Sequence, residues 1–243
     1  MLLSRVKRIL TDPEAFVETT SPQTPATTAD SGTIARWKES LRSPSFRLQF
    51  LLTGPILGIL LFSYAHFLDW IEVRPGVVLH DPLLASLQPH KFTWLIFGLV
   101  YGALMLGLGT LSRRPTALLV ALQSYALIIV VRMAAMYFTP LAPPSGMILL
   151  KDPFVQLFNN GVVLTKDLFF SGHTATLFLM FLTAQHRLLR TGFLLATVAV
   201  SAGLIWQHVH YTIDVLTAPF ITFACYRFVL SVHRDPQAPE VRR

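Results

Sequence analysis

The sequence predicts an all-α integral membrane protein, a bundle of six transmembrane helices, and three observations lead to this prediction. Hydrophobic residues make up 53% of the 243 residues and charged residues only 14%, a balance too apolar and too poor in charge for an ordinary soluble domain. The apolar residues gather in stretches of about 20, the length that crosses a bilayer as a helix. Basic residues gather in alternate connections between these stretches. A chain of this length holds about six such helices and no second folded domain.

Six stretches have the length and composition of membrane-spanning helices. They are residues 48–68, 92–111, 116–138, 171–185, 191–207 and 212–231. The fourth is the shortest and could begin earlier in the chain. Together they define a membrane domain at 48–231, followed by a short cytoplasmic tail at 232–243. The one cysteine, Cys225, has no second cysteine with which to form an intramolecular disulfide.

The first 47 residues differ from the rest of the chain. They are basic, and the stretch 11–33 is rich in Thr, Ser and Pro, with too little apolar surface to offset the entropy of ordering. We therefore predict that residues 1–47 form a cytoplasmic, largely disordered segment. A short amphipathic helix on the membrane surface is an alternative for residues 1–10.

The distribution of Lys and Arg predicts the orientation of the bundle. The N-terminal segment, the turn at 113–114, the turn at 186–190 and the tail are basic. By the positive-inside rule, both termini are cytoplasmic and the connections 69–91, 139–167 and 208–211 face outward. This topology and attraction to anionic lipid account for the net charge of +7, so no nucleic-acid partner is expected.

Two short stretches at the outer ends of the fourth and sixth helices carry residues suited to chemistry. His210 and Asp214 are four apart, so they can share one helix face, where the carboxylate bonds one imidazole nitrogen and leaves the other free. Ser171 is a candidate N-cap for the fourth helix. The backbone N–H groups near Gly172 and His173 then form a binding site for a phosphate oxyanion.

Together these residues predict an in-line phosphoryl transfer that requires neither metal nor cofactor. His210 attacks phosphorus, Asp214 orients it and stabilises the imidazolium, and His173 protonates the leaving oxygen. Positive charge is expected from the helix terminus and from cationic side chains nearby. The residues expected to bind substrate or phosphate are Ser171, Gly172, Thr174, Arg132, Asp167, Lys166 and Tyr211, with Lys151 as a further source of positive charge.

Other interpretations of the same residues remain open. A histidine at a helix end is often only a polar residue of the membrane interface, and Tyr211 is a candidate interface anchor. Arg132 could extend from the third helix to the membrane surface. His208, His210 and Asp214 are also the residue types of a zinc site.

Three stretches give the sequence a family resemblance. Residues 171–174, Ser-Gly-His-Thr, with Asp167 before them, are similar to the third motif of the sphingomyelin synthase-like branch of the phosphatidic acid phosphatase type 2 and haloperoxidase superfamily. Residues 210–215 are similar to its fourth motif, and residues 132–143 to the end of its second. The resemblance implies a six-helix fold and a catalytic triad of His173, His210 and Asp214 facing the lumen or exterior.

The sequence also departs from this family. The wider superfamily has a Lys-x6-Arg-Pro motif and an arginine six residues before the nucleophilic histidine, where this chain has Leu204. Arg114 precedes a proline, but the topology places it on the opposite side of the membrane from His210. Val209 replaces an acid typical of the eukaryotic synthases, and residues 165–166 replace their Cys-Gly.

The resemblance implies an enzyme that transfers a phospho-headgroup between membrane lipids through phosphohistidine, with a phospholipid donor and ceramide or diacylglycerol as acceptor. One alternative is a lipid phosphate phosphatase that uses water as the acceptor. Another is a non-catalytic lipid-binding or transport protein with the same fold. The sequence does not specify an oligomeric state.

Overall fold

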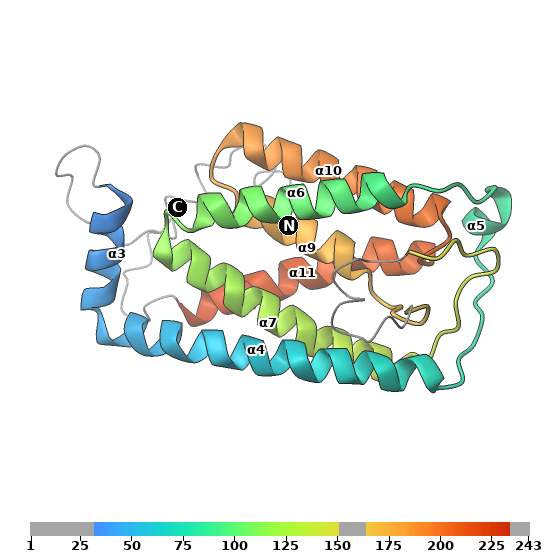
Figure 1. The fold of residues 1–243 in the computed structure, drawn as a ribbon, viewed down its shortest axis with the longest axis horizontal. Helices are drawn as coiled ribbons and strands as arrows, with labels where there is room; N and C mark the ends of the chain where they lie inside the picture. Colours follow the sequence, from blue (N-terminus) through green and yellow to red (C-terminus); the bar gives the residue numbers. More distant parts are fainter. Residues whose placement is uncertain (1–31, 151–163, 234–243) are drawn as a thin grey trace, which may run out of the picture.

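Three short turns, at residues 112–114, 184–186 and 207–211, and two longer connections, at 74–92 and 139–171, join the apolar helices of the bundle. The computed structural model describes residues 32–150 and 164–233, and within them every regular element is a helix. Two short helices, α3 (Thr33–Arg42) and α5 (Pro82–Ser86), lie at opposite ends of the bundle (Figure 1). The bundle helices are α4 (Pro44–Val73), α6 (Thr93–Leu111), α7 (Pro115–Phe138), α9 (Gly172–Thr183), α10 (Arg187–Trp206) and α11 (Thr212–Val232).

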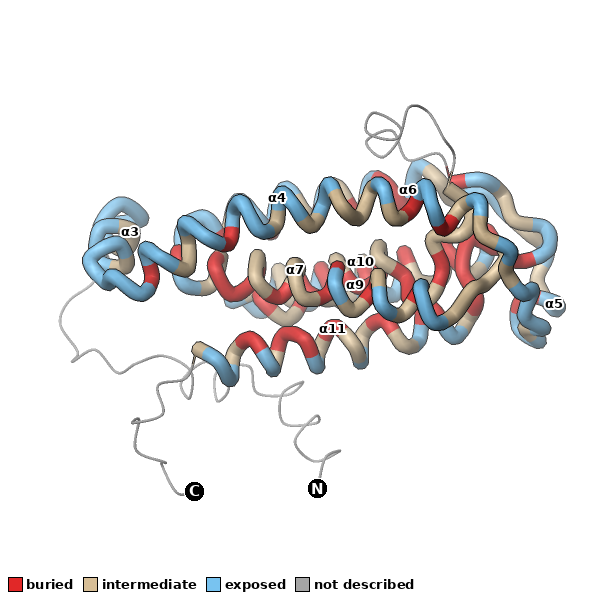
Figure 2. The backbone as a smooth tube through the Cα atoms, turned by 90° about the horizontal axis from the view of Figure 1, so that it is seen from below, coloured by how far each residue is buried: buried red, intermediate tan, exposed pale blue. Residues whose placement is uncertain are grey.

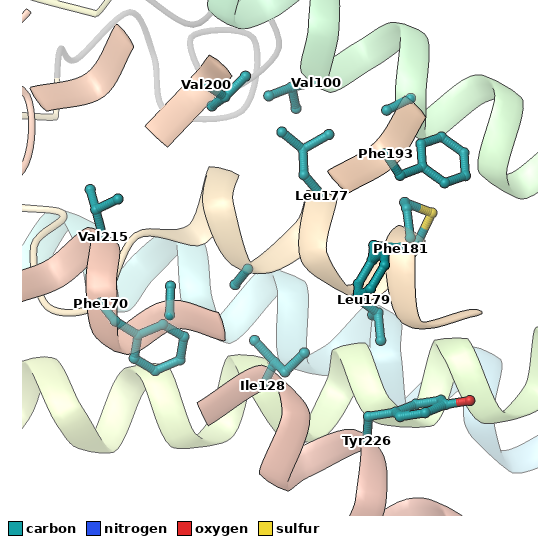
Figure 3. Packing of buried hydrophobic residues seen from close by; sticks show 14 of the residues in the cluster. Val100, Ile128, Phe170, Leu177, Leu179, Phe181, Phe193, Val200, Val215 and Tyr226 are labelled. Atoms are coloured by element: carbon teal, nitrogen blue, oxygen red, sulfur yellow. The ribbon is translucent and has the colours of Figure 1, made fainter. Parts of the chain in front are cut away.

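The core of the bundle is built around α9. This helix packs against α6, α7, α10 and α11, whereas α4 packs mainly against α7. Leu177, Leu179 and Phe181 of α9 belong to one buried cluster with Val100 of α6 and Phe193 of α10 (Figure 3). The outer helix α4 is exposed along most of its length (Figure 2). The most buried place in the fold is therefore around α9, where the candidate site also begins.

Five of the bundle helices, α4, α6, α7, α10 and α11, are long and apolar enough to cross a membrane. Many of their outward-facing side chains are large and apolar, which a soluble monomer avoids over such an area. These properties fit an integral membrane protein. The five helices confirm the corresponding predicted stretches with shifted ends, the largest shift being at α4, which runs from Pro44 to Val73.

The fourth predicted span, 171–185, is different. It forms α9, with only 12 residues, which rise about 18 Å and are too short to cross a hydrocarbon layer of about 30 Å. The helix does not begin earlier, because residues 164–171 are not helical. The predicted count of six spanning helices is therefore not confirmed, and the described chain has five long helices and one short central helix.

The segment before the bundle is more ordered than predicted. Residues 33–42 form α3, so the predicted disorder of residues 1–47 does not hold for this part. Ser43 then ends α3, and its side chain accepts a hydrogen bond from the Phe46 N–H at 3.4 Å to cap α4. Residues 11–31 of the predicted disordered stretch 11–33, the alternative helix at 1–10, Lys151 and the tail from 234 lie outside the described residues.

Gln207 ties together three connections at the α5 end of the bundle. Its fully buried side chain accepts a hydrogen bond from the Phe92 N–H at 2.8 Å and donates one to the Ile148 carbonyl at 3.1 Å. Its own backbone carbonyl accepts from the Ile148 N–H at 3.0 Å. One side chain thus joins the end of α10, the start of α6 and the connection after α7.

A close backbone contact also joins the connection after α4 to the connection after α7. Val77 and Leu141 pair as an isolated parallel bridge. Gly76 precedes the bridge, and a Cβ there would lie 2.5 Å from the carbonyl carbon of Leu141. Only glycine allows the two backbones to approach this closely.

Replacing Gln207 by Met should destabilise the protein. The variant leaves the Phe92 N–H and the Ile148 carbonyl without their partner, at a cost of about 1–3 kcal/mol. Thermal unfolding of the purified protein in detergent micelles measures the change. The matched control is Gln185→Met at the opposite end, where the exposed amide accepts from Arg114 and its loss should change stability by less than about 0.5 kcal/mol. Equal effects of both substitutions would contradict the structural role of Gln207.

Candidate active site

A buried histidine–aspartate pair lies at the start of α11. Nδ1 of His210 is 3.3 Å from Oδ2 of Asp214, and the two side chains are almost completely buried. The predicted hydrogen bond is therefore confirmed, but His210 lies before the helix and not on its face. Asp214 reaches back across the first turn and also accepts a hydrogen bond from the Tyr211 N–H at 3.2 Å. Within the described residues, this leaves Nε2 of His210 as the ring nitrogen without a hydrogen bond.

Asp214 also connects this pair to the start of α9. Its backbone carbonyl accepts a hydrogen bond from the Ser171 N–H at 3.1 Å. The Ser171 side chain accepts from the Thr174 N–H at 3.4 Å, which confirms the predicted N-cap. His173 follows as the second residue of α9, half-buried, with its ring 6.3 Å from that of Phe97. The structure thus brings the two helix starts that carry His173 and His210 side by side.

Arg132 holds the non-helical segment before α9. Its Nη2 lies 2.6 Å from Oδ1 of Asp167 and also donates to the backbone carbonyl of that residue at 3.3 Å. Nη1 donates to the Phe170 carbonyl, and Nε donates to the hydroxyl of Tyr64 at 2.8 Å. Tyr64 in turn donates to Asp167 at 3.0 Å. The guanidinium therefore uses four of its five donors on protein acceptors.

The side chain of Arg132 is 4% exposed, so it does not extend to the membrane surface. Four of its donors are used by the chain, and these contacts fix residues 167–170. A direct contact of Arg132 with phosphate stays a prediction. The charge still lies next to the start of α9, because Arg132 packs against Gly172.

Gly172 is required by the position of the arginine. A Cβ at this residue would lie 2.5 Å from Nη1 and 3.0 Å from Cζ of Arg132. Any side chain there must displace a guanidinium that is fixed by Asp167, Tyr64 and Phe170. The glycine of the Ser-Gly-His sequence therefore makes room for the ion pair beneath the helix start.

Substituting Gly172 by Ala should damage both stability and activity. Overpacking of this kind costs about 1–3 kcal/mol, and the displaced arginine releases residues 167–170. Thermal unfolding in detergent and turnover of phospholipid measure the two effects. Gly109→Ala in α6 is the matched control, since nothing lies within 4 Å of its Cβ and alanine favours a helix. Wild-type behaviour of the Gly172 variant would refute the close contact.

Lys166 lies in a different place from the one predicted. Its ammonium group donates to the backbone carbonyls of Glu72 at 2.8 Å and Arg74 at 2.7 Å, at the C-terminal end of α4. The carboxylate of Glu72 accepts from the backbone N–H groups of Thr165 and Lys166 at 2.8 and 3.0 Å. Lys166 is therefore a helix-end contact and not a free phosphate ligand. Glu72, which the sequence analysis did not single out, holds the segment that leads to Asp167.

Two further predicted substrate contacts have their hydroxyl groups engaged by the protein. The Tyr211 hydroxyl donates to the Ala142 carbonyl at 2.9 Å and accepts from the Leu79 N–H at 3.1 Å. The Thr174 hydroxyl lies 3.2 Å from that of Ser201 on α10. Both side chains are fully buried. Tyr211 therefore ties two connections to α11, and Thr174 ties α9 to α10.

The alternative zinc site is not assembled in the part of the chain that the structure describes. There, no three His, Cys, Asp or Glu side chains gather as a ligand set. His208 has a positive φ of 56°, and its Nδ1 lies 3.0 Å from the Ser145 carbonyl oxygen. Its buried Nε2 and Oδ1 of Asp214 have no hydrogen-bond partner among the described residues. Unpaired buried polar atoms are uncommon in folded proteins. Here one belongs to His208, two residues before His210, and one to Asp214, the hydrogen-bond partner of His210.

The carboxylate of Asp81 caps two helix starts, and the sequence analysis did not single it out. It accepts from the N–H groups of Leu83 and Leu84 at the start of α5, and from the N–H and hydroxyl of Thr212 at the start of α11. Burial raises the pKa of Asp81, but these donated hydrogen bonds more than offset it and hold the pKa below its usual value. Asp81 thus fixes the chain two residues after His210.

Asp81→Asn should lower stability at neutral pH by about 0.5–2 kcal/mol, the usual effect of losing a helix cap. Because folding lowers the pKa, the carboxylate stabilises the fold above the ordinary aspartate value of about 3.9. This contribution is lost as the pH falls through the lower folded value. The gap between wild type and variant should therefore shrink below about pH 4 in thermal unfolding measured from pH 7 to pH 3.

The exposed Asp69 provides the control for this titration. Asp69→Asn should change stability by less than about 0.5 kcal/mol at any of these pH values. A difference for Asp81→Asn that stays constant down to pH 3 would contradict the capping role.

Two positions where the sequence departs from the superfamily pattern have other surroundings than a phosphate ligand would need. Leu204 is fully buried in the core cluster. Arg114 lies in the turn between α6 and α7, at the α3 end of the bundle, and donates to Gln185 at 2.7 Å. The arginine that precedes a proline is therefore at the far end of the molecule from His210, as the topology predicted.

The fold and the site together define a helical membrane protein with a buried polar centre near one end. Residues 166–231 match the family described as PAP2 superfamily C-terminal. The match includes His173, His210 and Asp214 but neither Tyr64 nor Arg132. It supports the PAP2 superfamily, whose members are generally phosphatases and related phosphotransferases, and it does not reach the level of a branch. A comparison with curated proteins finds no match.

Proposed function

We propose that the protein is a lipid phosphotransferase of the sphingomyelin synthase-like type, which moves a phospho-headgroup between lipids through phosphohistidine. The observation that carries the proposal is the buried pair of His210 and Asp214, bonded through the Asp214 carbonyl to the start of α9. The match to the PAP2 superfamily supports a phosphatase or phosphotransferase reaction. The sphingomyelin synthase-like resemblance of residues 132–143, 171–174 and 210–215 supports the choice of transfer.

The geometry suits a nucleophilic histidine. With a proton on Nδ1, His210 donates to Asp214 and offers the lone pair of Nε2 to phosphorus. The N–P bond forms as the bond from phosphorus to the lipid oxygen breaks, and His173 gives the leaving oxygen its proton. The carboxylate then stabilises the positively charged ring. In the second step the hydroxyl of the acceptor attacks phosphorus, His173 takes its proton, and His210 is restored.

Two features favour negative charge where the phosphate would lie. The first backbone N–H groups of α9 have no partner within the helix, and the helix dipole adds positive potential there. Arg132 lies directly beneath this start, next to Gly172. Its charge attracts phosphate at this position, and four of its donors bond Asp167, Tyr64 and Phe170.

The burial of the nucleophile supports a lipid acceptor over water. His210 is 2% exposed, and exclusion of water protects a reactive intermediate from hydrolysis. We assign a phospholipid as donor and ceramide or diacylglycerol as acceptor. A lipid phosphatase would use the same residues and differ only in the acceptor, whereas a non-catalytic lipid-binding or transport protein would have no need of an oriented Nε2.

We also propose that the site faces away from the cytoplasm and that both termini are cytoplasmic. Exposed basic residues gather at the α3 end of the bundle, in α3 and in the turns after α6 and α9. The pair of His210 and Asp214 lies toward the opposite end. The positive-inside rule then orients the protein.

Transfer of labelled lipid in proteoliposomes tests the proposed function. Labelled phosphatidylcholine, phosphatidylethanolamine or phosphatidic acid is supplied with and without ceramide or diacylglycerol. We expect a new labelled lipid only when an acceptor is present, and a loss of at least about a thousandfold in His210→Ala, which removes the nucleophile. Asp214→Asn should slow turnover by orders of magnitude, as loss of an orienting carboxylate does in other triads.

His186→Ala is the matched control, because His186 is exposed at the far end of the bundle; it should retain full turnover. Release of water-soluble product regardless of acceptor would establish the phosphatase instead. Absence of turnover with every lipid, or full turnover in His210→Ala, would overturn the phosphohistidine mechanism.

A further inference from the structure

Helix α3 lies across the end of the bundle instead of continuing it. In Figure 1 the axis of α3 is steeply inclined to that of α4, and the break between them is at Ser43. Because the long helices define the direction of the membrane normal, α3 lies close to the membrane plane. Helix α3 also contacts the turn between α6 and α7, which lies at this end of the bundle. The Trp37 indole N–H donates a hydrogen bond to the Ser112 carbonyl in this turn at 2.8 Å.

The apolar side of α3 is only partly covered by the protein. Ile34, Trp37 and Leu41 follow the i, i+3, i+7 spacing of one helix face. Trp37 packs edge-on against Phe50 of α4, with ring centroids 5.4 Å apart. The other two remain open, with Ile34 72% and Leu41 42% exposed. Near the start of α4, Leu48 is also exposed, at 60%.

The remaining surface of this end is strongly basic. Exposed cationic side chains lie on α3, at the start of α4 and in the turns after α6 and α9: Lys38, Arg42, Arg47, Arg113, Arg114 and Arg187. In α3 itself the single acidic residue is Glu39. In α3, Lys38 and Arg42 lie beside the apolar stripe and not opposite it. A helix in the membrane plane with an apolar stripe flanked by basic residues is the arrangement of interfacial helices that bind anionic lipid.

We propose that α3 is an interfacial helix that binds the anionic phospholipid headgroups of its leaflet. Ile34 and Leu41 enter the acyl-chain boundary, while Lys38 and Arg42 extend to the headgroup phosphates. The occupant of this surface is lipid and not a protein partner, because α3 lies at the end of helices that are apolar enough to cross a membrane and because the exposed charge has one dominant sign. This assignment is independent of the reaction at His210.

Quenching by brominated lipid tests the proposal on the full chain. Thr33, exposed at the start of α3, is replaced by Cys in a Cys225→Ala background and labelled with bimane. The protein is reconstituted into vesicles that contain brominated phosphatidylcholine or brominated phosphatidylglycerol. We expect quenching by both lipids, with a clear preference for phosphatidylglycerol that weakens in 0.5 M salt because exposed charges are screened.

Variants of the two cations separate charge from folding. Lys38→Gln with Arg42→Gln should reduce the preference by roughly fivefold per charge, whereas Lys38→Arg with Arg42→Lys should keep it. Lys91→Glu, an exposed site at the opposite end of the bundle, changes the net charge by the same amount and should leave the preference unaltered. Equal quenching by the two lipids, no quenching by either, or a preference that survives the Gln variant would each overturn the proposal.

Discussion

The ion pair between the buried Arg132 and the half-buried Asp167 is the interaction on which the site depends. Residues 164–171 run without helical hydrogen bonds into the middle of an apolar bundle, and unpaired backbone groups there are costly in a membrane. Arg132 supplies donors to the carbonyls of Asp167 and Phe170 and to the Asp167 carboxylate. Removing the Asp167 carboxylate would leave the guanidinium of Arg132 buried without its partner, which typically costs several kcal/mol. The position of the start of α9 therefore depends on this ion pair.

Other polar side chains likewise bond the backbone of non-helical segments near the site. Glu72 holds the backbone N–H groups of residues 165 and 166, Asp81 holds that of Thr212, and Gln207 holds that of Phe92. In each case one polar side chain satisfies backbone groups from a distant part of the sequence. These contacts surround the two helix starts that carry His173 and His210. The candidate catalytic residues are thus positioned by a ring of side chains that have no part in the proposed chemistry.

Much of the fold could be predicted because it depends on local properties of the sequence. Hydropathy located five long helices, and four-residue spacing predicted the contact of His210 with Asp214. The cap at Ser171 followed in the same way from its place before a helix. The amphipathic helix α3 was not predicted because the composition of residues 1–47 as a whole is polar. Its apolar stripe covers only one side of ten residues.

The contacts of Arg132 and Lys166 could not be predicted for a different reason. Arg132 meets Tyr64 from 68 positions away, and Lys166 meets the end of α4 from more than 90 positions away. No local pattern specifies which distant acceptor a cation will find, since this depends on how the helices pack. Both residues therefore looked free to bind phosphate in the sequence. The short length of α9 could not be predicted for the same reason. The helix begins only after the segment that the ion pair holds, and hydropathy does not mark this point.

The shortness of α9 also sets the depth of the candidate site. The helix begins at Gly172 and ends beside the turn to α10, at the α3 end of the bundle. We take the α3 end of the bundle as one face of a hydrocarbon layer about 30 Å thick. A rise of about 18 Å from this face places the N-terminus of α9 about 12 Å below the opposite face. Electrostatic attraction is several times stronger at such depth than in water. A phosphate that reaches His210 has therefore left the headgroup layer, a descent open to a lipid whose acyl chains stay in the bilayer and unfavourable for a soluble phosphate ester.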